Sequence, residues 1–153
     1  MGRQSAETVS RRMSRVQSRD TAPELLVRTL VYGMGHRYRL GNRDLPGSPD
    51  LANRARAWAI FVHGCFWHAH EGCRLAGAPK VNPSYWLPKL EGNRRRDVQA
   101  VRALRRGGFR VLVVWQCELA SEGWVVGVLR EFLGGRRDRP RVGGDHSTAR
   151  NGR

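Results

Sequence analysis

Two short apolar runs, each followed three residues later by a cysteine, constrain the fold of this chain more than any other feature. They read Ala-Trp-Ala-Ile-Phe-Val at residues 57–62 and Phe-Arg-Val-Leu-Val-Val at residues 109–114. Runs of this length are typical of strands covered on both faces. Because helical patterns lie before, between and after them, the sequence predicts an α/β domain with a mixed central sheet flanked by helices.

Three helices are predicted from their end signals. Thr21-Ala22-Pro23-Glu24 forms a capping box with proline in the first turn, and glycines at 33 and 35 end the helix that follows. Ser84 is expected to cap a second helix, interrupted near Gly92, that ends at the glycines at 107 and 108. Residues 124–133 form the third helix, and residues 36–40 alternate weakly, as an edge strand does.

The balance of charge points to a polyanionic partner. The chain has 28 Lys and Arg residues against 13 Asp and Glu, a formal charge of +15, and only Lys80 and Lys89 are lysines. The planar fork of arginine suits phosphate, which favours nucleic acid. A membrane-surface protein, a ribosome-associated protein, or a genome whose codons favour arginine would also account for this balance. Charge does not separate DNA from RNA.

Length and composition favour one domain between two basic ends. A chain of 153 residues suits a single domain with its own core. Residues 1–20 form a basic arm, residues 21–133 the domain, and residues 134–153 an Arg- and Gly-rich tail that is expected to be disordered. No apolar run approaches 18 residues and no signal peptide is visible, so we expect a cytosolic protein without membrane contact.

Cysteine and histidine form one candidate metal site. Cys65, His70 and Cys73 lie close together in the sequence, and Cys117 follows the second apolar run. If the two strands are parallel neighbours, Cys65 and Cys117 reach the same edge of the sheet. Four protein ligands leave no open position, which predicts a structural Zn²⁺. An odd cysteine count argues against a disulfide framework. The alternative is three unrelated free thiols, because the spacing is not a standard Cys-x2-Cys pair.

A second polar group consists of Asp50, His63, His68 and Asp97. Asp50 follows Pro49, His63 directly follows the first apolar run, and Asp97 lies in a basic helix. A carboxylate in such a place can bind Mg²⁺, and an imidazole beside it can serve as a general base or acid. This pattern predicts a nuclease-type metal site. The alternative is an aspartate in a turn and histidines that pack or cap.

Two segments carry a close resemblance to a known family. They are Leu45-Pro46-Gly47-Ser48-Pro49-Asp50 and Phe61-Val62-His63-Gly64-Cys65-Phe66-Trp67-His68. With these segments and residues 11–16, 18–24 and 113–117, the chain resembles the very short patch repair (Vsr) endonucleases over residues 8–133. The resemblance implies a fold like that of type II restriction endonucleases. It also implies a nick 5′ of the thymine in T:G mismatches, which arise when 5-methylcytosine deaminates.

The resemblance also implies roles for the residues of the second polar group. Asp50 and the backbone carbonyl of Val62 would hold Mg²⁺, and His63 would contact the scissile phosphate. His68, paired with Asp97, would polarise a water, either a ligand of the metal or the attacking one. Val62 stands where the best-known members carry a hydroxyl side chain, a change that leaves the backbone carbonyl in place.

Further residues gain roles from the same resemblance. Glu24 would hold water at the edge of the metal site, and the alternative for this residue is a capping role alone. The structural zinc ligands would be Cys65, His70, Cys73 and Cys117. The side chains that wedge into the duplex would be Phe66, Trp67, Trp86 and Met13, with core packing the alternative for the first two. The DNA backbone would be held by Arg11, Arg12, Arg15, Arg19, Arg94, Arg95 and Arg96.

The resemblance places the protein in the bacterial cytoplasm, on the nucleoid, as a monomer that works beside a cytosine-5 DNA methyltransferase. Two other functions stay open. One is a mismatch-binding module that has lost its chemistry, although Asp50, His63, His68 and Asp97 are all present. The other is a restriction-type nuclease that cuts matched DNA, which needs a dimer to cut both strands.

Overall fold

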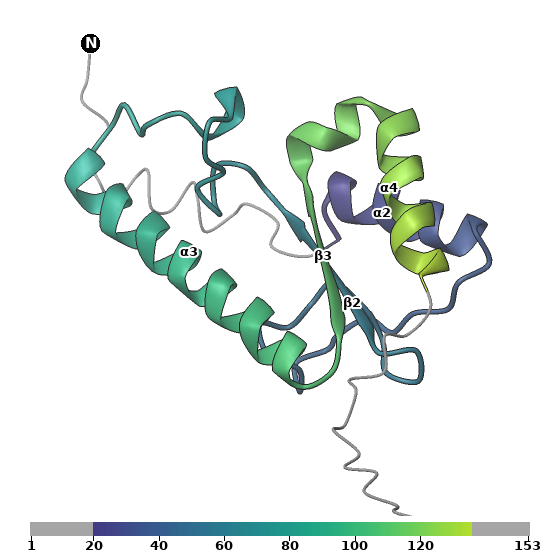
Figure 1. Cartoon of the computed structure of the whole chain (residues 1–153). Coiled ribbons are helices and arrows are strands. Elements are labelled where there is room, and N and C mark those ends of the chain that lie inside the picture. The colour runs from purple at the N-terminus through teal and green to yellow at the C-terminus, as the bar shows by residue number, and fades with distance from the viewer. Residues whose placement is uncertain (1–19, 136–153) are drawn as a thin grey trace, which may run out of the picture.

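A three-stranded mixed sheet lies between helices on its two faces in the computed structural model, which describes residues 20–135 (Figure 1). In chain order the described elements are α2 (Ala22–Gly33), β1 (Leu51–Asn53), β2 (Trp58–His63), the 3-10 helix η1 (Arg74–Ala76), α3 (Pro83–Arg106), β3 (Arg110–Trp115), the 3-10 helix η2 (Gln116–Ala120) and α4 (Glu122–Gly134). The sheet order is β1-β2-β3, with β1 antiparallel and β3 parallel to β2. This confirms the predicted α/β class and the mixed sheet.

The central strand β2 is buried along its whole length, as its apolar sequence predicts. Ile60 and Val62 pack in one cluster with residues of α2 and α4, and Ala59 and Phe61 pack in the other with residues of α3. Along β3 only Val114 is buried, because β3 lies at the edge of the described sheet. The prediction of a second strand covered as fully as the first is therefore wrong.

Helix α2 begins where the capping box predicts. The Thr21 side chain accepts a hydrogen bond from the N–H of Glu24 at 3.5 Å. The return bond differs from the motif, because Glu24 Oε2 accepts from the N–H of Asp20 at 3.0 Å. Within residues 20–135 no helix is long and apolar enough to cross a membrane.

Helix α3 differs from the prediction at its start and in its middle. It begins at Pro83 after Asn82, whose φ is 50°, so Ser84 lies in the first turn and is not the cap. The helix runs unbroken past Gly92. A glycine inside a helix costs about 1 kcal/mol. The burial of Leu90, Ala100 and Leu104 offsets that cost and keeps the helix continuous.

Short extended segments account for the remaining differences. Strand β1 has three residues, too few for alternation to indicate it. The expected strand over residues 36–40 is reduced to one bridge between Arg39 and Ala52. Residues 1–19 of the predicted arm and all of the predicted tail beyond residue 135 lie outside the described part of the chain.

Replacing Gly47 by alanine is expected to loosen the loop that leads to Asp50. At Gly47 φ is +72°, and an added Cβ would lie 2.5 Å from the Cβ of Ala100 and 3.2 Å from the Phe61 ring. Such overpacking costs about 1–3 kcal/mol. Gly41→Ala is the matched control, because φ there is +66° but no atom lies within 4 Å. The midpoint of thermal unfolding should fall clearly further in Gly47→Ala than in Gly41→Ala. Equal falls in the midpoint would contradict the tight contact at Gly47.

Candidate active site and metal centre

The parallel register of β2 and β3 brings two cysteines to one edge of the sheet. His63 pairs with Trp115 at the ends of the two strands. Cys65 and Cys117 each follow their strand by two residues, so both arrive at the same place. The predicted convergence of these two residues is confirmed.

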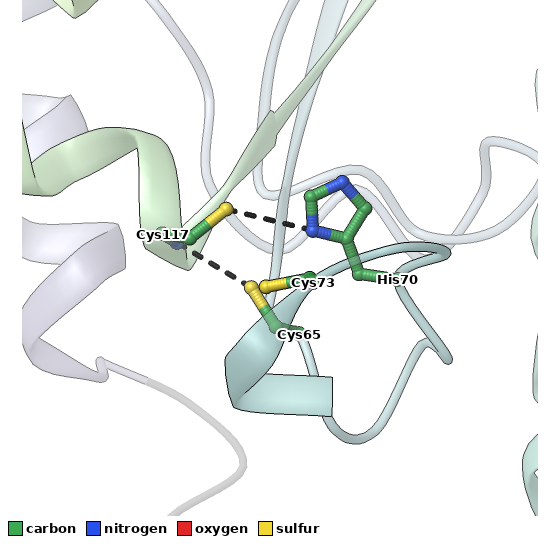
Figure 2. A group of neighbouring side chains, drawn as sticks. All are labelled: Cys65, His70, Cys73 and Cys117. Carbon is green, nitrogen blue, oxygen red and sulfur yellow. Dashed lines mark hydrogen bonds between the residues drawn. The ribbon is translucent and has the colours of Figure 1, made fainter. Parts of the chain in front are cut away.

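The four expected zinc ligands form one cluster (Figure 2). Each residue offers one ligand atom, and these four atoms all lie within 4.8 Å of one another. The residues are Cys65, His70, Cys73 and Cys117. Cys117 Sγ lies 3.5 Å from Nδ1 of His70, and the N–H of Cys117 donates to Cys65 Sγ at 3.4 Å. Zn–S bonds of about 2.3 Å place tetrahedral sulfur ligands roughly 3.8 Å apart. The cluster therefore fits a tetrahedral zinc ion.

The loop between Cys65 and Cys73 folds tightly to present its ligands. The N–H of His70 donates to the carbonyl of Cys65 at 2.9 Å, and Ala69 and Gly72 adopt positive φ of 48° and 70°. Burial, together with the two neighbouring thiols, raises the pKa of the Cys117 thiol to about 12. A bound cation would favour the thiolates of Cys65 and Cys117, which this site otherwise disfavours because burial raises the pKa of both thiols.

His63, His68 and Asp97 form a second cluster, with ligand atoms also within 4.8 Å of one another. The two imidazoles stack with centroids 3.9 Å apart and planes 3° from parallel. Each nitrogen lone pair lies in its ring plane, so one ion cannot lie in both planes at once. The pair is therefore better suited to proton transfer than to holding a shared metal.

Asp97 fixes the proton arrangement of His68. Nδ1 of His68 lies 2.6 Å from Oδ2 of Asp97. Because a carboxylate can only accept a hydrogen bond, Nδ1 is the donor, and Nε2 is left as the atom that can take a proton.

His63 is kept neutral by its surroundings. The side chain is buried, and burial together with the neighbouring His68 lowers its pKa to about 4. Its Nδ1 is buried and has no hydrogen-bond partner among residues 20–135. Near pH 7 the ring is therefore an uncharged imidazole, able to donate one hydrogen bond and accept another.

Asp50 lies beside the end of β2. Its Oδ2 accepts a hydrogen bond from the N–H of Val62 at 2.7 Å. Burial, and to a smaller extent the charge of Glu24, raises the pKa of Asp50 to about 6, against the lowering effect of that bond. The raised pKa marks a place where a cation would stabilise the ionised carboxylate.

A cavity of about 310 Å³ opens beside Asp50 and reaches Glu24. Glu24 is buried, and its Oε2 lies 3.4 Å from Arg28. The cavity is lined by Asp20, Glu24, Arg28, Leu40, Gly41, Asn42, Arg43, Ser48, Pro49 and Asp50. The acidic residue expected at the edge of the metal site thus shares one hollow with the expected metal ligand.

The three aromatic residues expected to wedge into DNA touch one another. Phe66 and Trp67 lie edge-on with centroids 5.3 Å apart, and Trp86 of α3 lies 5.9 Å from Trp67. Phe66 and Trp67 are half-buried, whereas Trp86 is only 3% exposed. Met13 lies outside the described residues.

The expected backbone-binding arginines divide into two groups. Arg94, Arg95 and Arg96 are exposed on α3. Arg94 forms an ion pair at 3.2 Å with Glu71, which lies in the loop between Cys65 and Cys73. The others, Arg11, Arg12, Arg15 and Arg19, lie outside the described residues.

Two residues that sequence reasoning missed support the site. Arg28 bonds Asp20 at 2.7 Å as well as Glu24, and the four-residue spacing from Glu24 could have indicated that pair. Asn42 donates to the carbonyl of Pro49 at 3.1 Å and so holds the backbone directly before Asp50. No pattern in the sequence distinguishes this asparagine from one in an ordinary turn.

Known proteins similar to this chain agree on one family. Residues 3–74 match the family model described as DNA mismatch endonuclease Vsr. The type II nicking enzyme V.XorIIP of Xanthomonas oryzae pv. oryzae is 49% identical over 79% of this chain and 88% of that protein. The DNA mismatch endonuclease Vsr of Escherichia coli (strain K12) is 39% identical over 73% of this chain and 71% of that protein. The chain belongs to the Vsr family of DNA mismatch endonucleases.

Proposed function

We propose that this protein nicks DNA on the 5′ side of the thymine in T:G mismatches by Mg²⁺-dependent hydrolysis of a phosphodiester. The observation that carries the proposal is the grouping of Asp50, His63 and the His68–Asp97 pair at the end of β2 in a member of the Vsr family. The formal charge of +15 supports a polyanionic substrate.

Asp50 and the backbone carbonyl of Val62 would hold the Mg²⁺. Carboxylate and carbonyl oxygens are the donors that this hard cation prefers. The raised pKa of Asp50, about 6, supports the assignment, because a cation would offset the cost of burying the carboxylate beside Glu24. When bound, the ion supplies electrostatic stabilisation of the charge that develops on the phosphate.

The two histidines would divide the remaining chemistry. Nε2 of His68 takes a proton from the attacking water, because its Nδ1 is held by Asp97. His63, neutral near pH 7, donates a hydrogen bond to the scissile phosphate. Glu24, held by Arg28 and the N–H of Asp20, orients water at the edge of the cavity.

The aromatic cluster would open the duplex at the mismatch. We expect Phe66, Trp67 and Trp86 to enter one groove, with Met13 entering from the other. A mismatched step costs less to unstack than a paired one, which is a source of selectivity. Trp86 is only 3% exposed, so its entry requires the cluster to rearrange on the DNA. The backbone would be held by Arg11, Arg12, Arg15, Arg19, Arg94, Arg95 and Arg96.

We place this activity in the bacterial cytoplasm, on the chromosome, as a monomer that follows a cytosine-5 DNA methyltransferase. The mismatches would come from deaminated 5-methylcytosine. The mixed sheet, with Asp50 just before β1 and the histidine of β2 at the strand end, would be the centre of a restriction-endonuclease-like fold. In this arrangement residues 21–133 form the endonuclease domain, and the basic arm before it contacts DNA.

Lowering the pH is expected to weaken Mg²⁺ binding. Burial raises the pKa of Asp50 to about 6, so below that pH a proton competes with the cation and affinity falls roughly tenfold per pH unit. The folded, metal-free protein also binds more protons than the unfolded chain between about pH 4 and 6, so this group stabilises the fold as the pH falls through that window. Half-maximal Mg²⁺ concentrations for nicking should be about fourfold higher at pH 5.5 than at pH 7.5, because roughly a quarter of Asp50 stays ionised at pH 5.5. Equal values would contradict the assignment.

The proposal is tested by incubating the purified protein and Mg²⁺ with duplexes that carry a central T:G, T:A or C:G pair. We expect nicking of the T:G duplex alone, lost with EDTA. Binding to T:G without a nick would instead indicate a recognition module. Cleavage of both strands in matched duplex would indicate a restriction-type nuclease.

A further inference from the structure

Trp115, the last residue of β3, contacts both candidate sites. Its ring stacks on the imidazole of His70, with centroids 4.0 Å apart and planes 6° from parallel. It also lies edge-on to the ring of His63, with centroids 5.1 Å apart and planes at 75°. One indole therefore touches a ligand of the Cys65–His70–Cys73–Cys117 centre and a histidine of the candidate active site.

Ring contacts position His63 in place of hydrogen bonds. The orientation of a functional histidine is commonly fixed by a hydrogen bond to one ring nitrogen. Nδ1 of His63 is buried and has no such partner among the residues that the structure describes. His68 stacks on the ring at 3.9 Å, and Phe61 and Trp115 lie at its sides at 5.6 and 5.1 Å. Removing the Trp115 ring would leave His63 free to tilt.

The position of Trp115 depends in turn on the metal centre. Its backbone N–H donates to Oε2 of Glu118 at 3.1 Å, and Cys117 follows it by two residues. Nδ1 of the stacked His70 lies 3.5 Å from Cys117 Sγ, within the four-ligand cluster. The zinc ion that these four residues fit would fix the plane of His70 and the end of β3 together. Trp115 would carry that constraint to His63.

We propose that Trp115 is a positioning residue that couples the Cys65–His70–Cys73–Cys117 centre to the orientation of His63. This inference rests on the proposed function, in which His63 contacts the scissile phosphate. It assigns the metal centre a part in setting the rate of nicking, beyond its contribution to stability.

Two substitutions break the coupling from opposite sides. Trp115→Leu removes the indole and leaves the four ligands in place. His70→Cys replaces the imidazole by a thiol, and a Cys₄ set is a common structural zinc site. Trp115→Phe retains an aromatic ring, and Trp124→Leu removes an exposed tryptophan of α4 as the matched control. For each variant we would measure zinc per chain, the unfolding midpoint, and kcat and KM for nicking of a T:G duplex.

We expect kcat to fall on the order of 10- to 100-fold in Trp115→Leu and His70→Cys, with KM and zinc content unchanged, because a misplaced catalytic group costs this much. Trp115→Phe should recover most of the rate, and Trp124→Leu should match the parent. A parental kcat in zinc-loaded Trp115→Leu or His70→Cys would overturn the proposal. So would a loss that Trp115→Phe shares in full.

Histidine spectra separate this proposal from the proposed function. With ¹⁵N-labelled histidine, the parent should show one sharp set of His63 signals, and Trp115→Leu should show broadened or doubled signals. A single sharp set in Trp115→Leu would overturn the coupling even if the parent nicks DNA. If the parent does not nick T:G duplexes, the proposed function fails, and the spectra still decide whether Trp115 orients His63. Should Trp115→Leu fail to fold, the same spectra are compared for His70→Cys and Trp115→Phe. His70→Cys should show broadened or doubled His63 signals, and Trp115→Phe should show one sharp set. A single sharp set in His70→Cys would overturn the coupling.

Discussion

Asp50→Ala is expected to abolish nicking while the protein still binds mismatched DNA. Asp50 is the carboxylate assigned to Mg²⁺, and its Oδ2 is already aligned by the N–H of Val62. Loss of the proposed Mg²⁺ would remove several kcal/mol of transition-state stabilisation, a rate loss on the order of 10³-fold or more. Binding should persist because the aromatic cluster and the arginines of α3 do not contain Asp50. Single-turnover nicking and gel-shift titrations on the same T:G duplex would measure the two effects.

The matched control is Asp44→Ala. Asp44 lies in the loop that precedes Asp50, is exposed, and pairs with Arg54 at the surface. Surface ion pairs contribute about 0–1 kcal/mol, so Asp44→Ala should nick at the parental rate. Parental nicking by Asp50→Ala would show that the metal site is assigned to the wrong carboxylate. Loss of DNA binding by Asp50→Ala would show that its effect is not confined to chemistry.

Cys117→Ser, or removal of zinc by a chelator, is expected to abolish cooperative folding. Binding to a structural zinc site contributes about 10–16 kcal/mol in zinc-finger peptides, whereas whole domains are stable by only about 5–15 kcal/mol. Cys117 joins the end of β3 to the loop after β2, so its loss releases two segments of the fold. Circular dichroism during heating should show a broad transition at a lower temperature. Elemental analysis should show one zinc per chain in the parent and less in the variant.

Gln116→Ala is the control for this loss. Gln116 is exposed, lies in η2 beside Cys117, and offers no metal ligand, so its variant should retain zinc and a cooperative transition. All three cysteines of the chain belong to the cluster, so a cysteine outside it cannot serve for comparison. Parental protein without zinc that unfolds cooperatively would contradict the structural role.

The strongest sequence signals predicted the parts of the fold that periodicity and chemistry determine. The apolar run at residues 57–62 indicated β2. The cysteine three residues after each run was expected to reach a shared site if the two strands are parallel neighbours, and they are. A strand covered on both faces must be apolar throughout, so a short stretch of sequence is enough to reveal it. Strand β1 was missed because three residues carry no periodicity. The continuity of α3 through Gly92 was missed because it depends on packing against the sheet.

The candidate site likewise has contacts that were expected before the structure and contacts that only the structure shows. His68 and Asp97 are 29 residues apart in the chain, yet they lie 2.6 Å apart, and their pairing was expected from the family resemblance. The contribution of Asn42 and the position of Trp115 between two sites depend on tertiary contacts alone. A turn asparagine and a tryptophan at a strand end are common in sequences, so neither carries a signal of its own.

The position of the nick tests the proposed function most directly. A T:G duplex with randomised flanks, labelled in turn on each strand, would be incubated with the protein and Mg²⁺ and the products read at single-nucleotide resolution. We expect one cut, on the thymine strand, directly 5′ of the mismatched thymine, with the other strand intact. Cuts on the guanine strand, cuts spread along either strand, or an intact T:G duplex under conditions of full binding would contradict the proposed function.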